Sequence, residues 1–211
     1  MQLDLIPPAP WSFGPGARLL PQRALASAPA LLADIAALGQ ISPPRQMKTP
    51  GGHQMTAALT NCGALGWVSS EAGYAYTATD PLTGVGWPAM PARWLELAQA
   101  AAAEAGYPGF EPDVCLINRY PVGSKLGLHQ DKDERSHDHP VVSISLGLSA
   151  TFVFGGLKRT DPLTAFTLSH GDMAVWGGAS RLYHHGVRTL AKGVHPATGA
   201  VRYALTFRKA G

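Results

Sequence analysis

The stretch Asn118-Arg-Tyr-Pro-Val-Gly-Ser-Lys-Leu-Gly-Leu-His-Gln-Asp-Lys-Asp-Glu134 decides how the rest of the chain is interpreted. At its centre, His129 and Asp131 are two residues apart, and residues at this spacing in an extended segment point to the same face. The imidazole and the carboxylate can therefore bind one metal ion. The tripeptide alone is a weak signal, because His-x-Asp also occurs on solvated surfaces.

A second imidazole must come from elsewhere in the chain. His184 and His185 lie far enough downstream to belong to a different strand. Two histidines and one carboxylate form the ligand set that leaves coordination positions open on iron(II). Adjacent residues of a strand face opposite sides, so the spacing does not choose between His184 and His185.

A pair of arginines near the C-terminus adds a different kind of site. Arg202 and Arg208 are six residues apart, and strand alternation places them on one face with Ala204 and Thr206 between them. Guanidinium groups bind carboxylates bidentately. Six residues of strand span about 20 Å, which two arginine side chains can reduce to the length of a five-carbon dicarboxylate. The alternative is a solvated terminal strand, but such a strand would not normally carry Ala and Thr between its arginines.

The composition is that of one globular domain with a modest basic excess. A chain of 211 residues can bury a core without a second domain. The net charge of +3 permits a polyanionic partner but does not predict one. Cys62 and Cys115 are expected to be reduced thiols. The N-terminus lacks a secretory pattern and no segment approaches about 20 consecutive apolar residues, so we expect a cytoplasmic protein without membrane contact.

Helical patterns precede a region of short strands. One helix is expected after Ser27, ending at Gly39, and another from Pro91 to Gly106. Residues 1–24 are rich in Pro and Gly and are expected to be irregular, and the runs flanking Pro50-Gly51-Gly52 predict a β-hairpin. The short strands and Gly-rich turns that follow indicate a mainly β (α+β) fold with a sandwich or jelly roll. These strands are expected at 114–120, 141–148, 151–154, 166–168, 173–176, 182–185 and 200–208.

The order of Asn118-Arg-Tyr120, His129-x-Asp131-x-Asp133, His185-Gly186 and Arg202-x5-Arg208 resembles the AlkB family of iron- and 2-oxoglutarate-dependent nucleic-acid dealkylases. The resemblance extends over nearly the whole chain. It implies a double-stranded β-helix in a single domain of residues 1–211. Within that domain it implies a nucleotide-recognition lid over roughly residues 45–90 and a jelly-roll catalytic core over roughly residues 113–211.

The resemblance also assigns roles around the metal. His129, Asp131 and His185 would be the iron(II) ligands, because the family places its second histidine ligand directly before Gly. The family often has Asn where this chain has Ala204, which predicts a lower affinity for the cosubstrate. The residues implied to bind 2-oxoglutarate are Asn118, Tyr120, Arg202 at the distal carboxylate and Arg208 near the iron-bound end.

The substrate contacts follow from the same matching. Trp67 and His129 would sandwich a flipped base, and Asp133 would lie by its exocyclic amino group. Methylation at adenine N1 or cytosine N3 makes the base cationic, so a desolvated carboxylate would favour the lesion. The alternative for Asp133 is a solvated residue of an acidic loop. Tyr74, Tyr76 and Arg159 would approach the base or a phosphate.

The implied activity is oxidative demethylation of 1-methyladenine and 3-methylcytosine, with O2 consumed and succinate and formaldehyde released. The implied partner is alkylated DNA in single-stranded form, bound by a monomer. RNA or protein demethylation and hydroxylation are the nearest alternatives, and a zinc-dependent hydrolase or a metal-binding jelly-roll module is a more distant one. Arg202 and Arg208 argue against the zinc-dependent hydrolase and the metal-binding module, because zinc sites have no use for a dicarboxylate clamp.

Overall fold

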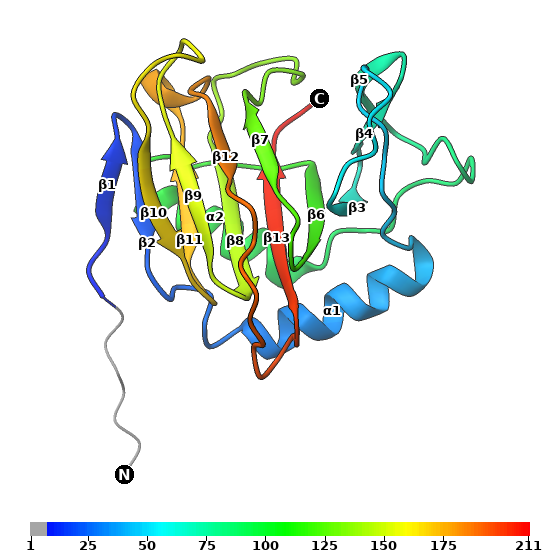
Figure 1. The fold of residues 1–211 in the computed structure, drawn as a ribbon, viewed down its shortest axis with the longest axis horizontal. Coiled ribbons are helices and arrows are strands. Elements are labelled where there is room, and N and C mark those ends of the chain that lie inside the picture. Colours follow the sequence, from blue (N-terminus) through cyan, green and yellow to red (C-terminus); the bar gives the residue numbers. More distant parts are fainter. Residues whose placement is uncertain (1–7) are drawn as a thin grey trace.

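The computed structural model describes residues 8–211 of the chain and consists of antiparallel sheets with two helices (Figure 1). One sheet has seven strands in the order β1-β2-β11-β8-β13-β6-β3, and a second has four in the order β10-β9-β12-β7. The strands β4 and β5 form a separate hairpin. The elements are β1 Trp11–Gly14, β2 Ala17–Leu20, α1 Ala28–Ile41, β3 Ala58–Gly63, β4 Gly66–Ser70, β5 Gly73–Thr77, α2 Ala92–Glu104, β6 Val114–Pro121, β7 Leu126–His129, β8 Val141–Gly147, β9 Ala150–Phe154, β10 Thr164–Leu168, β11 Met173–Trp176, a 3-10 turn at Gly178–Ser180, β12 His185–Val187 and β13 Val201–Arg208.

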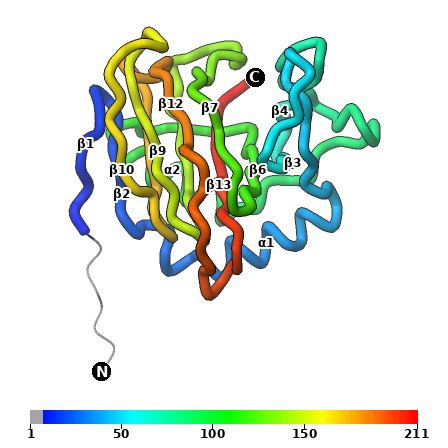
Figure 2. The backbone as a smooth tube through the Cα atoms, viewed as in Figure 1, coloured from blue at the N-terminus to red at the C-terminus, as the bar shows by residue number. Residues whose placement is uncertain are grey.

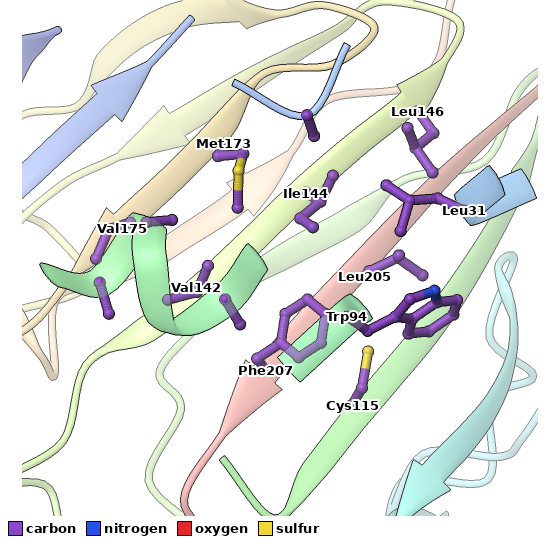
Figure 3. Packing of buried hydrophobic residues seen from close by; sticks show 14 of the residues in the cluster. Leu31, Trp94, Cys115, Val142, Ile144, Leu146, Met173, Val175, Leu205 and Phe207 are labelled. Carbon is purple, nitrogen blue, oxygen red and sulfur yellow. The ribbon is translucent and has the colours of Figure 1, made fainter. Parts of the chain in front are cut away.

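The large sheet has a buried core on each face. On one face, α1 and α2 pack against alternate residues of the central strands, among them Ile144, Leu205 and Phe207, with Trp94 of α2 fully buried between them (Figure 3). The other face packs against the four-stranded sheet through an aromatic cluster that includes Phe152. Two stacked antiparallel sheets of this kind form a jelly-roll sandwich, which confirms the predicted fold class.

Strand β13 shows how the alternation positions the site. Leu205 and Phe207 point to the helices and are fully buried. Ala204, between the two arginines, belongs to the core between the sheets. Arg202 and Arg208 are only 1% and 5% exposed, so a solvated terminal strand is excluded. The predicted polar face therefore lies inside the molecule.

Several predicted element boundaries were wrong. Of the Pro- and Gly-rich residues 1–24, residues 1–7 lie outside the described part of the chain, and the rest contains β1 and β2. The aromatic rings of β1, Trp11 and Phe13, pack against β10 and β9. Helix α1 passes through Gly39 and ends at Ile41. Ser42 has an extended conformation (φ −131°, ψ 88°), as expected for a residue followed by proline.

Other errors concern the segments around the site. The predicted strand 182–185 is β12, which begins only at His185. The expected hairpin around Pro50 is present, but it is held by the isolated antiparallel bridges Lys48–Gln54 and Arg45–Leu59 in place of continuous strands. The strands β3, β4, β5 and β7 were not predicted. In the backbone trace, the β4–β5 hairpin stands beside β3 and β6, at the edge of the large sheet (Figure 2). Within residues 8–211, every helix falls short of the length and apolarity needed to cross a membrane.

Candidate metal centre and adjoining cavity

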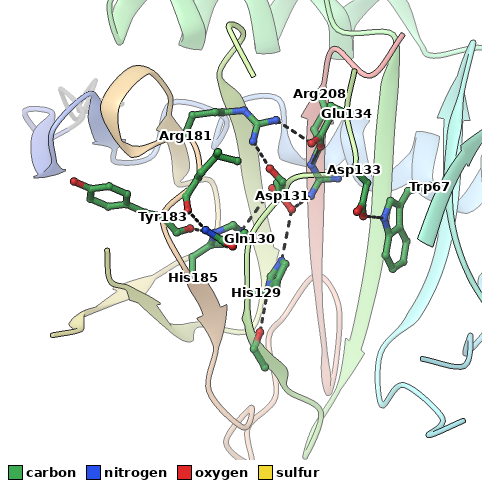
Figure 4. A network of polar contacts seen from close by, with 12 residues as sticks. Trp67, His129, Gln130, Asp131, Asp133, Glu134, Arg181, Tyr183, His185 and Arg208 are labelled. Atoms are coloured by element: carbon green, nitrogen blue, oxygen red, sulfur yellow. Dashed lines mark hydrogen bonds and ion pairs between the residues drawn. The ribbon is translucent and has the colours of Figure 1, made fainter. Parts of the chain in front are cut away.

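Three potential metal ligands meet where β7 and β12 pair. His129 ends β7, His185 begins β12, and the two residues lie opposite each other in the register of this strand pair. Asp131 lies just beyond the end of β7 (Figure 4). One ligand atom from each of the three residues lies within 4.8 Å of the others. The structure therefore brings together the His-x-Asp pair and the distant histidine that the sequence predicted.

Both imidazoles are oriented by hydrogen bonds to backbone carbonyls. The Nδ1 atom of His129 lies 2.9 Å from the Gly127 carbonyl oxygen, and that of His185 lies 2.9 Å from the Tyr183 carbonyl oxygen. A carbonyl only accepts, so each Nδ1 must carry the proton, which leaves the lone pair of Nε2 free for a metal. Each Nε2 lies 3.6 Å from an Asp131 carboxylate oxygen.

Charge and burial keep these groups in the protonation states that bind metal. Burial and the neighbouring His129 lower the pKa of His185 to about 3, so its imidazole is neutral at pH 7. Burial alone would raise the pKa of Asp131, but Arg208 and the two histidines outweigh it and hold that pKa well below its usual range. The Oδ2 atom of Asp131 is buried without a hydrogen-bond donor. A divalent cation would satisfy this carboxylate, so the residues fit iron(II).

The register of β12 settles which adjacent histidine joins the cluster. His185 is 3% exposed and belongs to the three-residue cluster, whereas His184 lines the same cavity but stands outside the cluster, with its Nδ1 3.3 Å from the Gly156 carbonyl oxygen. The residue after His185 is glycine because β12 passes close to β7 at this point. A Cβ on residue 186 would lie 2.7 Å from the Leu126 carbonyl oxygen. The His-Gly dipeptide thus has a packing reason.

A cavity of about 560 Å³ extends from the metal cluster between the two sheets. Arg202 and Arg208 both line it, and each has a buried Nη1 atom without a hydrogen-bond partner. The Arg202 guanidinium is held by Nε, which donates to Ser145 Oγ at 3.1 Å, and it lies over the Tyr120 ring at 5.2 Å. Asn118 lines the same wall. Two unpartnered guanidinium donors at separate points of a buried cavity fit a dicarboxylate.

The cavity mouth carries aromatic and charged residues. The half-buried Trp67 ring stacks on Tyr74, with centroids 5.3 Å apart, and its Nε1 donates to Asp133 Oδ2 at 3.1 Å. Arg159 lines the mouth and donates through Nη1 to the Leu128 carbonyl at 2.6 Å. Trp67, Tyr74, Asp133 and Arg159 are therefore brought together as predicted, although Trp67 and Asp133 bind each other.

Tyr76 is placed differently from the other predicted substrate residues. It does not line the cavity, and its hydroxyl donates instead to Glu134 Oε1 at 2.8 Å. Tyr76 pairs directly with Trp67 across the hairpin, whereas Tyr74 pairs with Ser69 farther along. The strand alternation therefore gives Tyr74 and Tyr76 one face, but only Tyr74 reaches the cavity.

Sequence reasoning missed three residues that support the cluster. Glu134 and Arg181 are buried and form an ion pair of 3.3 Å, and Arg181 Nη1 donates to the Asp131 backbone carbonyl at 2.7 Å (Figure 4). The Gln130 amide donates to the Leu182 carbonyl at 2.6 Å and so ties the segment after β7 to the one before β12. A charged run after a metal-binding motif was the available signal for Glu134, but it did not reveal burial.

Known proteins with similar sequences identify the family. Residues 16–208 match the model of the 2OG-Fe(II) oxygenase superfamily, and the chain belongs to that family. It is 54% identical over 212 residues to the alpha-ketoglutarate-dependent dioxygenase AlkB of Escherichia coli (strain K12), covering 99% of this chain and 98% of that protein. Identity to the Salmonella typhimurium protein of the same name is 53% over 204 residues, covering 96% and 94% of the two chains.

A solved structure agrees with these sequence matches. The structure of OsALKBH1 superposes with a TM-score of 0.86 at 28% identity, covering 95% of this chain and 100% of that one. The sequence matches extend through the metal cluster and both arginines. The chain is therefore an AlkB-type alpha-ketoglutarate-dependent dioxygenase, that is, an enzyme that uses iron(II), 2-oxoglutarate and O2.

Proposed function

We propose that the chain repairs alkylated nucleic acid by oxidative demethylation of 1-methyladenine and 3-methylcytosine, releasing formaldehyde and succinate. One observation carries this proposal. A single cavity joins the metal cluster, the two inward-facing arginines and a mouth lined by Trp67, Tyr74 and Asp133. Binding of a base at the mouth would bring its N-methyl group toward the cluster. The AlkB names of the relatives at 53–54% identity support the same substrate class.

The inner residues would bind the metal and the cosubstrate. His129, Asp131 and His185 would hold iron(II), which when bound activates O2 at the expense of 2-oxoglutarate for oxidation of the methyl group. Asn118 and Tyr120 would add hydrogen bonds to 2-oxoglutarate. The distal carboxylate would bind the free donor of Arg202, and the other end would lie near that of Arg208. Ala204 offers no polar group in this wall, so we expect weaker cosubstrate binding than an amide there would give.

The outer residues would select the base. A flipped base would stack between Trp67 and the His129 ring, with its exocyclic amino group replacing the Trp67 indole N–H at Asp133. Burial of a cationic base against this carboxylate stabilises it relative to a neutral base. Arg159 has further guanidinium donors for a phosphate, and the exposed Tyr74 ring can stack on a neighbouring base. Tyr76 is left out of the proposed contacts because Glu134 engages its hydroxyl.

The remaining organisation follows from this arrangement. We propose that residues 45–90, which include the β4–β5 hairpin, form a nucleotide-recognition lid and that residues 113–211 form the catalytic core. The proposed substrate is single-stranded DNA, because an unpaired base costs less to extrude, and RNA is the alternative. We further propose a monomer that works in the cytoplasm, where reduced iron and 2-oxoglutarate are present.

The test is anaerobic reconstitution with iron(II) and 2-oxoglutarate, followed by O2 and a panel of methylated oligonucleotides. Formaldehyde and succinate should appear in equal amounts with 1-methyladenine or 3-methylcytosine in single-stranded DNA. The unmethylated oligonucleotide and a reaction without 2-oxoglutarate serve as controls. Matched RNA oligonucleotides and duplexes measure the preference among nucleic acids. Product formation that is independent of 2-oxoglutarate and supported by zinc would instead indicate a hydrolase.

A further inference from the structure

A partly buried hydrogen bond joins the β4–β5 hairpin to Glu134, a residue beside the metal cluster that does not line the cavity. Tyr76 of β5 donates its hydroxyl to Glu134 Oε1 at 2.8 Å. The Glu134 side chain is only 1% exposed, and the residue follows Asp131 closely in the chain. Burial raises the pKa of the Tyr76 phenol, so the hydroxyl keeps its proton and remains a donor. A hydrogen bond from a neutral donor to a buried carboxylate is among the stronger ones in proteins.

Two arginines connect Glu134 to the metal ligand Asp131 (Figure 4). Arg208 lies with Nε 3.3 Å from Glu134 Oε1 and donates through Nη2 to Asp131 Oδ1 at 2.9 Å. Arg181 lies with Nη2 3.3 Å from Glu134 Oε2 and donates through Nη1 to the Asp131 backbone carbonyl at 2.7 Å. All four residues are buried. Two carboxylates thus face two guanidinium groups. Removal of the negative charge of Glu134 would leave one buried guanidinium cation uncompensated.

We propose that Glu134 is a positioning residue that fastens the β4–β5 hairpin to the metal cluster, with Tyr76 as the anchor on the hairpin and Arg181 and Arg208 as the connection to Asp131. Tyr76 pairs across the hairpin with Trp67, so the anchor also fixes the ring that would stack on the base. That last link rests on the proposed function. The anchor and the connection to Asp131 do not depend on it.

The neighbouring bond between Trp67 and Asp133 has a different character. Asp133 is exposed, and its carboxylate lies at the cavity mouth. This bond can be exchanged when a base enters, whereas the Tyr76–Glu134 bond lies outside the cavity and can remain. The same end of the hairpin is also held through β4, because the Asn61 side chain bonds the backbone N and O of Trp67, the partner of Tyr76, at 3.0 Å each. Asn61 fixes the hairpin to β3 but makes no contact with the metal cluster.

The first test compares Tyr76→Phe with Tyr107→Phe by hydrogen exchange of the substrate-free protein. Each variant loses one tyrosine hydroxyl, and that of Tyr107 donates to the Gly16 carbonyl far from the hairpin. The lost bond to a charged group predicts that amides of residues 72–77 exchange roughly 10- to 100-fold faster in Tyr76→Phe. Tyr107→Phe should leave this peptide unchanged. Equal amide exchange rates for residues 72–77 in the two variants would overturn the anchoring role of Tyr76.

The second test uses Glu134→Gln, which keeps the shape and one acceptor but removes the charge. Mn(II) affinity, measured without substrate, should fall by about 10- to 100-fold, as for other partners of metal ligands. In this background Tyr76→Phe should accelerate hairpin exchange only about 2- to 10-fold, because a hydrogen bond to a neutral acceptor is weaker. Unchanged Mn(II) affinity, or the full effect of Tyr76→Phe, would refute the role of Glu134.

Steady-state kinetics separate a positioning role from a general loss of stability. Tyr76→Phe should raise KM for a methylated oligonucleotide while kcat stays within about twofold of the original value, because the metal ligands remain in place. A loss of kcat in Tyr76→Phe with an unchanged KM would contradict the proposal. Hydrogen exchange and Mn(II) binding require no turnover, so a failure of the proposed demethylase activity would be recognised separately. If Glu134→Gln does not fold, the amide hydrogen exchange of the hairpin in Tyr76→Phe alone tests the proposal.

Discussion

Arg202→Lys tests whether the inner arginine binds 2-oxoglutarate. Arg202 is 1% exposed, donates through Nε to Ser145 and lies over the Tyr120 ring. One donor, Nη1, is buried without a partner and is available to a carboxylate. Lysine keeps the positive charge but loses the planar fork that holds Ser145 and points Nη1 into the cavity. We therefore expect the substitution to remove a fixed donor and not the charge.

The size of the effect follows from the lost hydrogen bond. Hydrogen bonds to charged groups contribute about 1.5 to 3 kcal/mol, and each 1.4 kcal/mol is a factor of about ten in affinity. The affinity for 2-oxoglutarate should fall by roughly one to two decades. Mn(II) affinity should be unchanged, because the side-chain partners of Arg202 are Ser145 and Tyr120 and not the three candidate ligands.

The assay is calorimetric titration of 2-oxoglutarate into anaerobic, Mn(II)-loaded protein, which binds the cosubstrate without turning over. Arg18→Lys is the matched control, because Arg18 is exposed on β2 and lies outside the cavity walls. Thermal unfolding of both variants shows whether the fold is kept. An unchanged affinity for 2-oxoglutarate in Arg202→Lys would remove Arg202 from the site, and a parallel loss of Mn(II) affinity would indicate distortion of the whole cavity.

Five further substitutions test the rest of the site. Asp131→Ala should abolish formaldehyde release and weaken Mn(II) binding in a metal titration, because two neutral imidazoles do not offset a divalent charge; near-normal turnover would place the metal elsewhere. In the same titration, His185→Ala should cost far more than His184→Ala, and the reverse order would reassign the ligand. Gly186→Ala should destabilise the protein by about 1 to 3 kcal/mol, because the new Cβ would meet a carbonyl of β7; an unchanged Tm in calorimetry would refute this packing. Asp133→Asn should spare iron and 2-oxoglutarate binding but lower turnover of cationic lesions selectively.

The parts of the site that the sequence could predict depend on short-range periodicity and on motifs. The alternation of β13 placed Arg202 and Arg208 on one face, and the structure confirms this with Leu205 and Phe207 buried on the other. The His-x-Asp spacing brought two candidate ligands together, with His129 at the end of β7 and Asp131 just beyond it. Each of these inferences requires only that a few consecutive residues be extended.

The parts that could not be predicted depend on pairing between distant segments. The choice between His184 and His185 depends on where β12 begins and on its register with β7, and neither is encoded in the dipeptide itself. Glu134 belongs to a charged run, Lys-Asp-Glu-Arg, that is typical of a solvated loop. Its burial results from Arg181 and Tyr76, which come from segments 47 and 58 residues away in the sequence. Long-range ion pairs of this kind leave no local pattern.

The selectivity expected at Asp133 follows from an exchange of hydrogen-bond donors. Without substrate, the Trp67 indole N–H donates to the Asp133 carboxylate at 3.1 Å, so a neutral base would only replace one neutral donor with another. A base made cationic by methylation adds an ion contact, whose Coulomb energy at 4 Å is about 1 kcal/mol in water and about 4 kcal/mol at an effective dielectric constant of 20. In Asp133→Asn this contact is lost while the shape remains. The ratio of turnover on 1-methyladenine to turnover on 3-methylthymine, a neutral lesion, should therefore fall by at least about fivefold. Both lesions are measured in one variant, so a loss of folding or metal would lower both rates together and leave the ratio unchanged. An unchanged ratio would mean that Asp133 serves to hold Trp67 and that selectivity comes from stacking and cavity shape.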